Sequence, residues 1–175
     1  KLIYNFDFDD RVVNKLDPDW QNSIVKDVFF TKDPIRGQVL SLSAPNSFID
    51  YSKDNKLNFT TPISISTWIK PDSIMNFMGI IGFGSAFSLK LNNGNPDFTT
   101  ATIKDHILNK TLKKSIWYHL VVVVNPEASV EFYIDGNKEG EIATSEIKSS
   151  NQSLVVGNNI WGEQFYGSIR SEEHT

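Results

Sequence analysis

Apolar and polar residues alternate with a period of two along much of this chain, most clearly between residues 115 and 137. Such alternation, rich in β-branched and aromatic residues, predicts β-strands because successive side chains of a strand point to opposite faces. Residues 121–124 are four valines with no polar face, so we expect this strand to be covered on both sides. Pro126 interrupts the pattern, and Asp135-Gly136 predicts a tight hairpin turn after the following strand.

The same pattern predicts an all-β, antiparallel domain. Asn93-Gly94 predicts a second hairpin. No stretch has sustained helical spacing, and residues 73–78 or 105–109 would form one helical turn at most. Short strands separated by turn signals every 8–12 residues or so are typical of a β-sandwich or jelly roll. Strands are expected at residues 2–8, 24–30, 38–42, 48–51, 63–69, 79–83, 87–91, 98–103, 116–124, 130–135, 139–143, 154–156 and 164–169.

Composition narrows the class of protein. A chain of 175 residues with 39% hydrophobic residues suits one domain with a substantial core. The net charge of −4 gives no basic surface, so nucleic acid is not an expected partner. Residues 120–124 form the longest apolar run, far short of a membrane span. The chain has no cysteine, which excludes disulfides and thiolate metal sites, and it lacks a start methionine and a signal peptide, so we expect a piece of a longer protein.

An ordered set of segments resembles one known family. Residues 117–121 (WYHLV) and 130–136 (VEFYIDG) are similar to the laminin G-like, pentraxin-like branch of the concanavalin A-like lectins and glucanases. Residues 65–71, 154–158 and 165–169 are similar to other strands of that family. The resemblance implies a jelly roll of two curved antiparallel sheets. It also implies an extracellular recognition module that binds glycans or proteins and is attached to other domains of one polypeptide.

The end of the chain departs from the family pattern. The family ends with an acidic, aliphatic-rich strand, whereas residues 170–175 (RSEEHT) match the in-frame translation of a widely used sequencing adapter. We therefore expect one laminin G-like domain over residues 1–169 that lacks its last strand. Residues 170–175 are expected to be a non-native tail acquired in an assembled environmental (metagenomic) sequence.

No residues form a convincing catalytic constellation. The glucanase relatives hydrolyse glycosidic bonds with two carboxylates on one strand, roughly 5 Å apart. Glu131 and Asp135 are the nearest approach, but Asp135 precedes Gly136 in a turn, where aspartate is favoured by its own backbone hydrogen bonding. His119 lies within a strand with no Asp, Cys or second His nearby, so we expect a packed core histidine rather than a ligand. No catalytic residue is predicted.

Calcium is a candidate cofactor at the start of the chain. Asp7, Asp9 and Asp10 could hold a structural calcium together with backbone carbonyls, a common position in the family, or they could be solvated charges at a sheet edge. The pentraxin-like double calcium site needs acidic residues where this chain has Asn158 and Asn159, so that site is not expected.

One loop offers the groups that bind sugars. Asn158, Asn159, Trp161 and Gln164 combine an aromatic face for C–H stacking with planar amides for paired hydroxyls. The alternative is that Trp161 folds back to cover the end of the sandwich. Trp68 is a second candidate, although it resembles a structural tryptophan of the family, and we expect both Trp68 and Trp117 in the core.

The sequence thus favours a non-catalytic module of a larger secreted or cell-surface protein, of bacterial origin, that binds a glycan or an extracellular protein. A purely structural or adhesion spacer is the alternative. An endo-acting glycoside hydrolase is the third interpretation.

Overall fold

The computed structural model describes residues 5, 6, 8, 12, 24–53, 62–100, 104–125, 128–144, 147 and 150–170. Strands make up the regular structure of this part of the chain, and it contains no helix. The strands are β1 (Ile24–Lys26), β2 (Phe29–Asp33), β3 (Gly37–Leu42), β4 (Phe48–Lys53), β5 (Ile63–Pro71), β6 (Met78–Phe83), β7 (Phe87–Asn92), β8 (Asn95–Thr100), β9 (Lys104–Ile107), β10 (Tyr118–Asn125), β11 (Ser129–Ile134), β12 (Asn137–Ala143), β13 (Ser153–Val156) and β14 (Gly167–Arg170).

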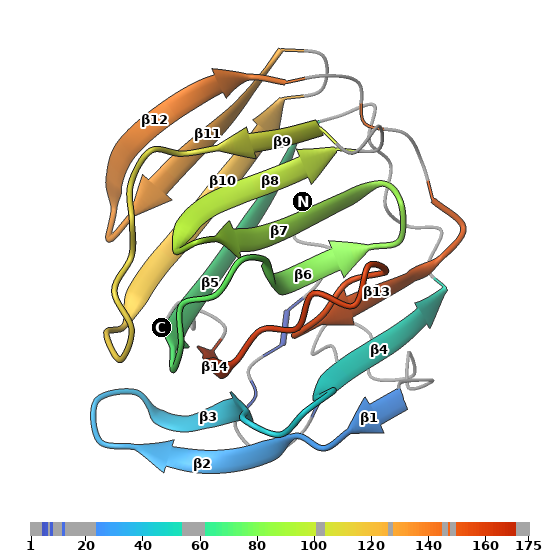
Figure 1. Cartoon of the computed structure of the whole chain (residues 1–175), viewed down its shortest axis with the longest axis vertical. Coiled ribbons are helices and arrows are strands. Elements are labelled where there is room, and N and C mark those ends of the chain that lie inside the picture. Colours follow the sequence, from blue (N-terminus) through green and yellow to red (C-terminus); the bar gives the residue numbers. More distant parts are fainter. Residues whose placement is uncertain are drawn as a thin grey trace.

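Two antiparallel sheets pack face to face as a jelly-roll sandwich (Figure 1). The front sheet, nearer the viewer in Figure 1, has the strand order β1-β4-β13-β6-β7-β8-β9, and the back sheet has the order β12-β11-β10-β5-β14-β3-β2. This confirms the all-β fold class expected from the alternation of side chains.

Two hairpins follow from their turn residues. Asn93 and Gly94 have φ angles of 50° and 83°, and Asp135 and Gly136 have 51° and 81°. Two consecutive positive φ angles match the right-handed twist of the strands they join. These turns connect β7 to β8 and β11 to β12, as predicted.

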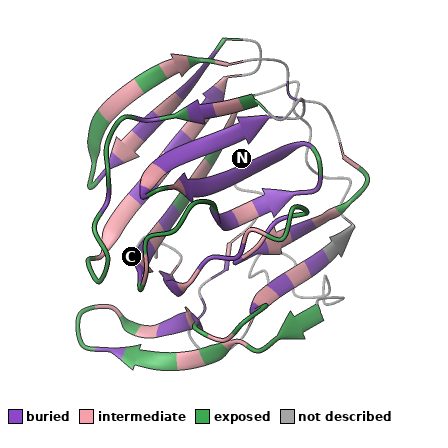
Figure 2. Cartoon of the chain, in the orientation of Figure 1, coloured by how far each residue is buried: buried purple, intermediate pink, exposed green. Residues whose placement is uncertain are grey.

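The core lies between the two sheets. Burial alternates along β10 of the back sheet, whereas β7 and β8 of the front sheet are buried along almost their whole length (Figure 2). The front sheet contributes Leu89, Leu91 and Phe98, and the back sheet contributes side chains such as Val122 and Phe132, all fully buried. Every second residue of a strand faces outward, and these outward residues decide what each outer face can bind.

The structure corrects several expectations. Strand β10 is not covered on both sides, because Val121 and Val123 lie half-buried on the outer face of the back sheet. Residues 104–107 form strand β9 instead of part of a helical turn, since pairing with β8 supplies their backbone partners. The strand expected over residues 24–30 is split at Asp27, which has a φ of 48°.

Two predictions concern the chain termini. Residues 1–4, 7, 9 and 10 lie outside the described residues, although Phe6 and Phe8 are buried in the core. Arg170, the first residue of the predicted tail, ends β14, and its Nη1 donates to the carbonyls of Arg36 and Gln38, both at 2.6 Å. Residues 171–175 lie outside the described residues, so the non-native tail stays a prediction.

Candidate functional site

The β13–β14 loop (residues 157–166) carries all four predicted sugar-binding residues, and local chemistry fixes its shape. Gly157 and Gly162 have φ angles of 84° and 75°, which glycine adopts without strain. The base of the loop is closed because the Phe165 N–H donates to the Gly157 carbonyl at 2.9 Å. The loop is therefore a defined structure with its two ends together.

Asn159 is buried and organises this loop from inside. Its Oδ1 accepts the N–H groups of Trp161 (3.1 Å) and Glu163 (3.2 Å). Its Nδ2 donates to Ser88 Oγ at 3.0 Å and to Glu163 Oε2 at 2.7 Å. All the amide functions of Asn159 are thus engaged within the protein, which gives this side chain a positioning role.

Gln164 is buried too, and it ties the loop to the turn between β3 and β4. Its Oε1 accepts the Asn46 N–H, and its Nε2 donates to the Ala44 carbonyl at 2.7 Å. Gln164 therefore supports the site from behind rather than facing solvent.

The β13–β14 loop lies across the outer face of the front sheet because β6 lacks side chains there (Figure 1). A Cβ at Gly79 would come 2.6 Å from the Glu163 carbonyl oxygen, and one at Gly82 would come 2.9 Å from Asn159 Cβ. The Gly79 N–H also donates to that carbonyl at 2.6 Å. These two glycines bring the loop into contact with the sheet and divide its outer face into two halves.

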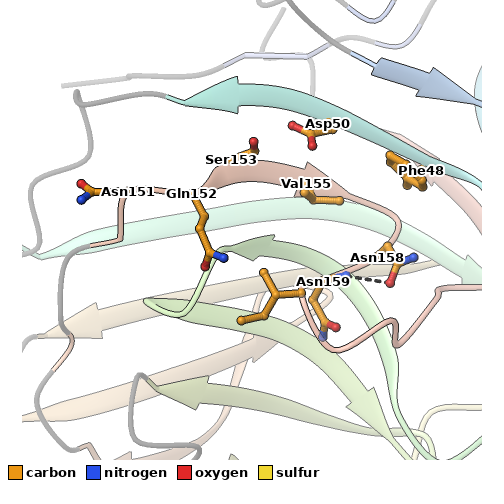
Figure 3. A pocket seen from close by; sticks show the side chains of 9 residues that line it. Phe48, Asp50, Asn151, Gln152, Ser153, Val155, Asn158 and Asn159 are labelled. Atoms are coloured by element: carbon orange, nitrogen blue, oxygen red, sulfur yellow. Dashed lines mark hydrogen bonds between the residues drawn. The ribbon is translucent and has the colours of Figure 1, made fainter.

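One half is a groove of about 450 Å³ (Figure 3), which we call the amide groove. It is lined by side chains of β4, of β13 with its preceding turn, and of the β13–β14 loop: Phe48, Asp50, Asn151, Gln152, Ser153, Val155, Asn158, Asn159 and Ile160. Asn158 Oδ1 accepts the Asn159 N–H at 2.8 Å. The Asn158 Nδ2 and the side-chain amides of Asn151 and Gln152 have no partner among the described residues, so they can bond a ligand.

The other half holds four charged side chains, Lys90, Asp97, Asp105 and Glu163, which we call the lysine cluster. Lys90 Nζ lies 3.9 Å from Asp97 Oδ2, 3.2 Å from Asp105 Oδ1 and 3.5 Å from Glu163 Oε2. Lys90 and Asp97 are directly opposite one another on β7 and β8. Three carboxylates therefore surround one ammonium group on the outer face of the sheet.

Asp97 has the most perturbed environment in this cluster. Burial and the neighbouring Asp105 raise the pKa of its carboxyl to about 7, against the opposing effect of Lys90. Its Oδ1 is buried and has no hydrogen-bond partner within the described part of the chain. At neutral pH this carboxyl is consequently divided between its charged and neutral forms.

Trp161 belongs to the lysine cluster rather than to the amide groove. Its ring centre lies 5.8 Å from Lys90 Nζ, and the ring of Phe77, from the β5–β6 connection, lies 4.4 Å from the same atom. Both aromatic side chains are exposed, so Trp161 does not fold back over the end of the sandwich. The structure thus separates Trp161 from Asn158, which lines the groove.

The outer face of the back sheet holds the residues that we expected in the core. Trp68 is half-buried there, with Arg36 Cζ 3.2 Å above its ring and the His119 ring stacked at 4.8 Å. His119 Nε2 lies 2.9 Å from Ser66 Oγ. The core expectations for Trp68 and His119 are wrong because the register of β5 and β10 directs both side chains outward, and Trp117 is likewise only partly buried.

The two acidic residues considered for catalysis have structural contacts. Asp135 Oδ1 accepts the N–H of His119, on the neighbouring strand β10, at 2.8 Å. The side chain therefore bonds across the sheet, and the expectation that it bonds the backbone of its own turn is wrong. Glu131 Oε2 accepts the Tyr133 hydroxyl at 2.5 Å and pairs with Lys138 at 3.3 Å.

The calcium prediction falls on Asp7, Asp9 and Asp10, which lie outside the described residues, so it stays a prediction. Within the described ranges, no three His, Cys, Asp or Glu side chains gather as a metal site. In that same part of the chain, no helix has the length and hydropathy of a membrane span.

Sequence reasoning missed two parts of the site. Asn151 and Gln152 lie in a polar turn whose one motif, the Asn151-Gln152-Ser153 glycosylation sequon, does not indicate a binding site. The pairing of Lys90 with Asp97 is predictable from the sequence, because a two-residue Asn93-Gly94 turn places residues 90 and 97 opposite one another.

Comparison with known proteins agrees with this architecture. A family model described as the concanavalin A-like lectin/glucanases superfamily matches residues 45–171. No curated protein sequence gives a match.

Several solved structures share the fold. Domain 4 of AbnA, a GH43 extracellular arabinanase from Geobacillus stearothermophilus in complex with arabinotriose, has a TM-score of 0.75 and 19% identity, covering 97% of this chain and 89% of that one. The binding domain of Paraclostridial Mosquitocidal Protein 1 has a TM-score of 0.72 and 18% identity, covering 99% of this chain and 49% of that one. A botulinum neurotoxin type C structure, whose cell entry depends on two ganglioside molecules, has a TM-score of 0.66 and 15% identity, covering 100% of this chain and 48% of that one. The chain thus spans about half the length of the two toxin chains.

Proposed function

Because this chain belongs to the concanavalin A-like lectin/glucanases superfamily, we propose that it is a non-catalytic glycan-binding module of a larger secreted or cell-surface protein. The observation that carries the proposal is the amide groove beside the β13–β14 loop. The amides of Asn151 and Gln152 can each donate to and accept from a sugar hydroxyl, and Asn158 can donate through its Nδ2. Phe48, Val155 and Ile160 supply apolar surface for the C–H faces of a sugar ring.

The similar proteins support this class of ligand. The arabinanase domain was crystallised with a short arabinose oligomer, and the neurotoxin depends on gangliosides, which carry oligosaccharides. The arabinanase structure is one domain of a larger extracellular enzyme. A binding role for the present chain agrees with that arrangement.

The first test is binding of immobilised glycans to the purified chain, with arabino-oligosaccharides and ganglioside oligosaccharides as the first probes. Replacing Asn158 by Ala removes one unpartnered amide from the groove, and we expect a five- to tenfold or so weaker affinity, corresponding to about 1 kcal/mol. Gln152→Ala should act in the same direction.

The matched control is Asn137→Ala, which removes an exposed amide at the β11–β12 turn of the back sheet. Unchanged binding in Asn158→Ala and Gln152→Ala would remove the groove from the proposal. If no glycan binds at millimolar concentration, the spacer interpretation takes its place, and release of reducing ends from a β-glucan panel would instead favour the hydrolase.

A further inference from the structure

Five groups converge on a single ammonium on the outer face of the front sheet, across the β13–β14 loop from the amide groove. The carboxylates of Asp97, Asp105 and Glu163 and the rings of Phe77 and Trp161 all lie within 5.8 Å of Lys90 Nζ. They come from β8, β9 and two separate connections, so the tertiary fold itself assembles this arrangement.

The charges of this cluster do not balance. Three carboxylates face one lysine, which leaves two negative charges in excess when all four groups are ionised. Along the paired strands and the loop, these are the charged groups that face the site. Lys104 alternates to the other side of β9 from Asp105.

Asp97 adds a second observation, because one of its buried carboxylate oxygens lacks a hydrogen-bond donor in the described part of the chain. Its side chain is 0% exposed and lies within the cluster. Its Oδ2 accepts from Asn92 Nδ2 at 3.4 Å, whereas its Oδ1 has no hydrogen-bond partner among the described residues. A buried polar atom without a partner is uncommon and costs free energy. A proton on Asp97 offsets part of the excess charge, consistent with its raised pKa.

We propose that the lysine cluster is a subsite for a protonated amine, namely the free ammonium group of an amino sugar within a glycan. The ammonium would contact Asp105 and Glu163, whose side chains keep 28% and 17% of their surface exposed. The pyranose ring would stack on Trp161 or Phe77, both of which already border a cation. This inference rests on the proposed glycan-binding function and specifies its ligand class.

An amine fits the cluster better than a metal ion. A divalent cation needs several oxygen ligands around its own position, whereas Lys90 Nζ already occupies the centre of these carboxylates. An amine instead approaches from the solvent side, where aromatic faces and the two partly exposed carboxylates remain available.

The test compares glucosamine oligomers with N-acetylglucosamine oligomers of the same length by calorimetry at pH 7. We expect at least tenfold tighter binding of the free amine form, with the preference weakening as salt is added. Asp105→Asn and Glu163→Gln each keep the oxygen that accepts from Thr99 or Asn159. Each should therefore fold and reduce the preference about tenfold.

Glu141→Gln is the matched control, since it neutralises an exposed carboxylate that pairs with Lys138 on the back sheet, and it should leave the preference unchanged. Equal binding of the two oligomers, or a preference that survives in Asp105→Asn and Glu163→Gln, would overturn the amine subsite. The amine subsite would also be overturned if the cluster bound calcium and no amine. Calcium would then raise the melting temperature of the parent protein but not that of Glu163→Gln.

The two proposals can fail separately. If neutral glycans bind through the amide groove and the glucosamine oligomers bind no more tightly than the N-acetylglucosamine oligomers, only the amine subsite is rejected. If no glycan of either kind binds, both proposals are rejected.

Discussion

Two lysines of this protein are each paired with several carboxylates, yet their surroundings differ. Lys138 pairs with Glu131 and Glu141 on the outer face of the back sheet, and 43% of its side chain is exposed. Lys90 pairs with three carboxylates on the front sheet, and only 4% of its side chain is exposed. An exposed ion pair contributes little to stability, whereas a buried one costs desolvation and is strongly destabilising to break. The comparison predicts that breaking the buried cluster lowers the free energy of unfolding far more than breaking the exposed one.

Lys90→Met should have the largest effect on stability. It leaves Asp97, Asp105 and Glu163 without their central cation, and we expect a loss of about 3–5 kcal/mol in the free energy of unfolding at pH 7. Urea denaturation measures this loss. A change below about 1 kcal/mol would show that the buried and exposed clusters are equivalent, and the comparison would no longer hold.

Asp97→Asn should stabilise the protein at pH 8, by on the order of 2 kcal/mol. The pKa of Asp97 is raised to about 7 in the folded state, from an ordinary value near 3.8. The folded protein therefore holds a proton that the unfolded chain has lost, and stability falls as the pH rises from about 4 to about 7.

Denaturation at several pH values measures how the free energy of unfolding falls with pH. The Asp97→Asn variant should largely lose this pH dependence. Stability that is unchanged between pH 4 and pH 7 in the parent protein would contradict the assignment. Lys138→Met should leave the pH dependence of the free energy of unfolding unchanged.

Gly79→Ala tests whether the β13–β14 loop needs a glycine on the outer face of β6 in order to pack against that strand. The new Cβ would lie 2.6 Å from the Glu163 carbonyl, which is backbone and cannot rotate away, so we expect a loss of about 1–3 kcal/mol in the free energy of unfolding. Gly140→Ala is the control, because its Cβ would meet only the end of the Leu108 side chain, which can move. Equal costs in both variants would mean that the loop is not held by this contact.

Lys138→Met should have the smallest effect, a loss of under about 1 kcal/mol that fades with added salt. The same denaturation series measures it. A larger loss would show that the exposed cluster also contributes substantially, which would weaken the contrast with Lys90.

Most of the fold is predictable from the alternation of apolar and polar side chains and from the two hairpin turns. Asn93-Gly94 sets the register of β7 and β8 along their whole paired length, as a two-residue turn predicts. Asp135-Gly136 sets the pairing of β11 and β12 only as far as Tyr133 and Lys138, because a bulge then shifts the register. Strand β9 is not predictable from the sequence, because residues 104–107 show no clear alternation of apolar and polar side chains. Pairing with β8 determines their extended conformation.

The candidate site was only partly predictable. Asn158 and Trp161 were predicted as one surface, but the loop places them on opposite sides. Asn159 and Gln164 carry the same chemistry as Asn158, and only tertiary contacts show that their amides are engaged internally. Residue type alone cannot tell an amide that holds a loop from one that meets a ligand.

The closed base of the β13–β14 loop has a consequence for engineering. The Gly157 N–H donates to the Ile80 carbonyl at 2.8 Å, and the Gly157 carbonyl accepts the Phe165 N–H, so the segment leaves and rejoins the framework at one point. Segments of similar length could therefore be exchanged between these two anchors, provided that they keep Asn159, Glu163 and Gln164, which bond the loop to β7, to β6 and to the β3–β4 turn. The fold would then serve as a carrier whose specificity is retargeted by one short insertion.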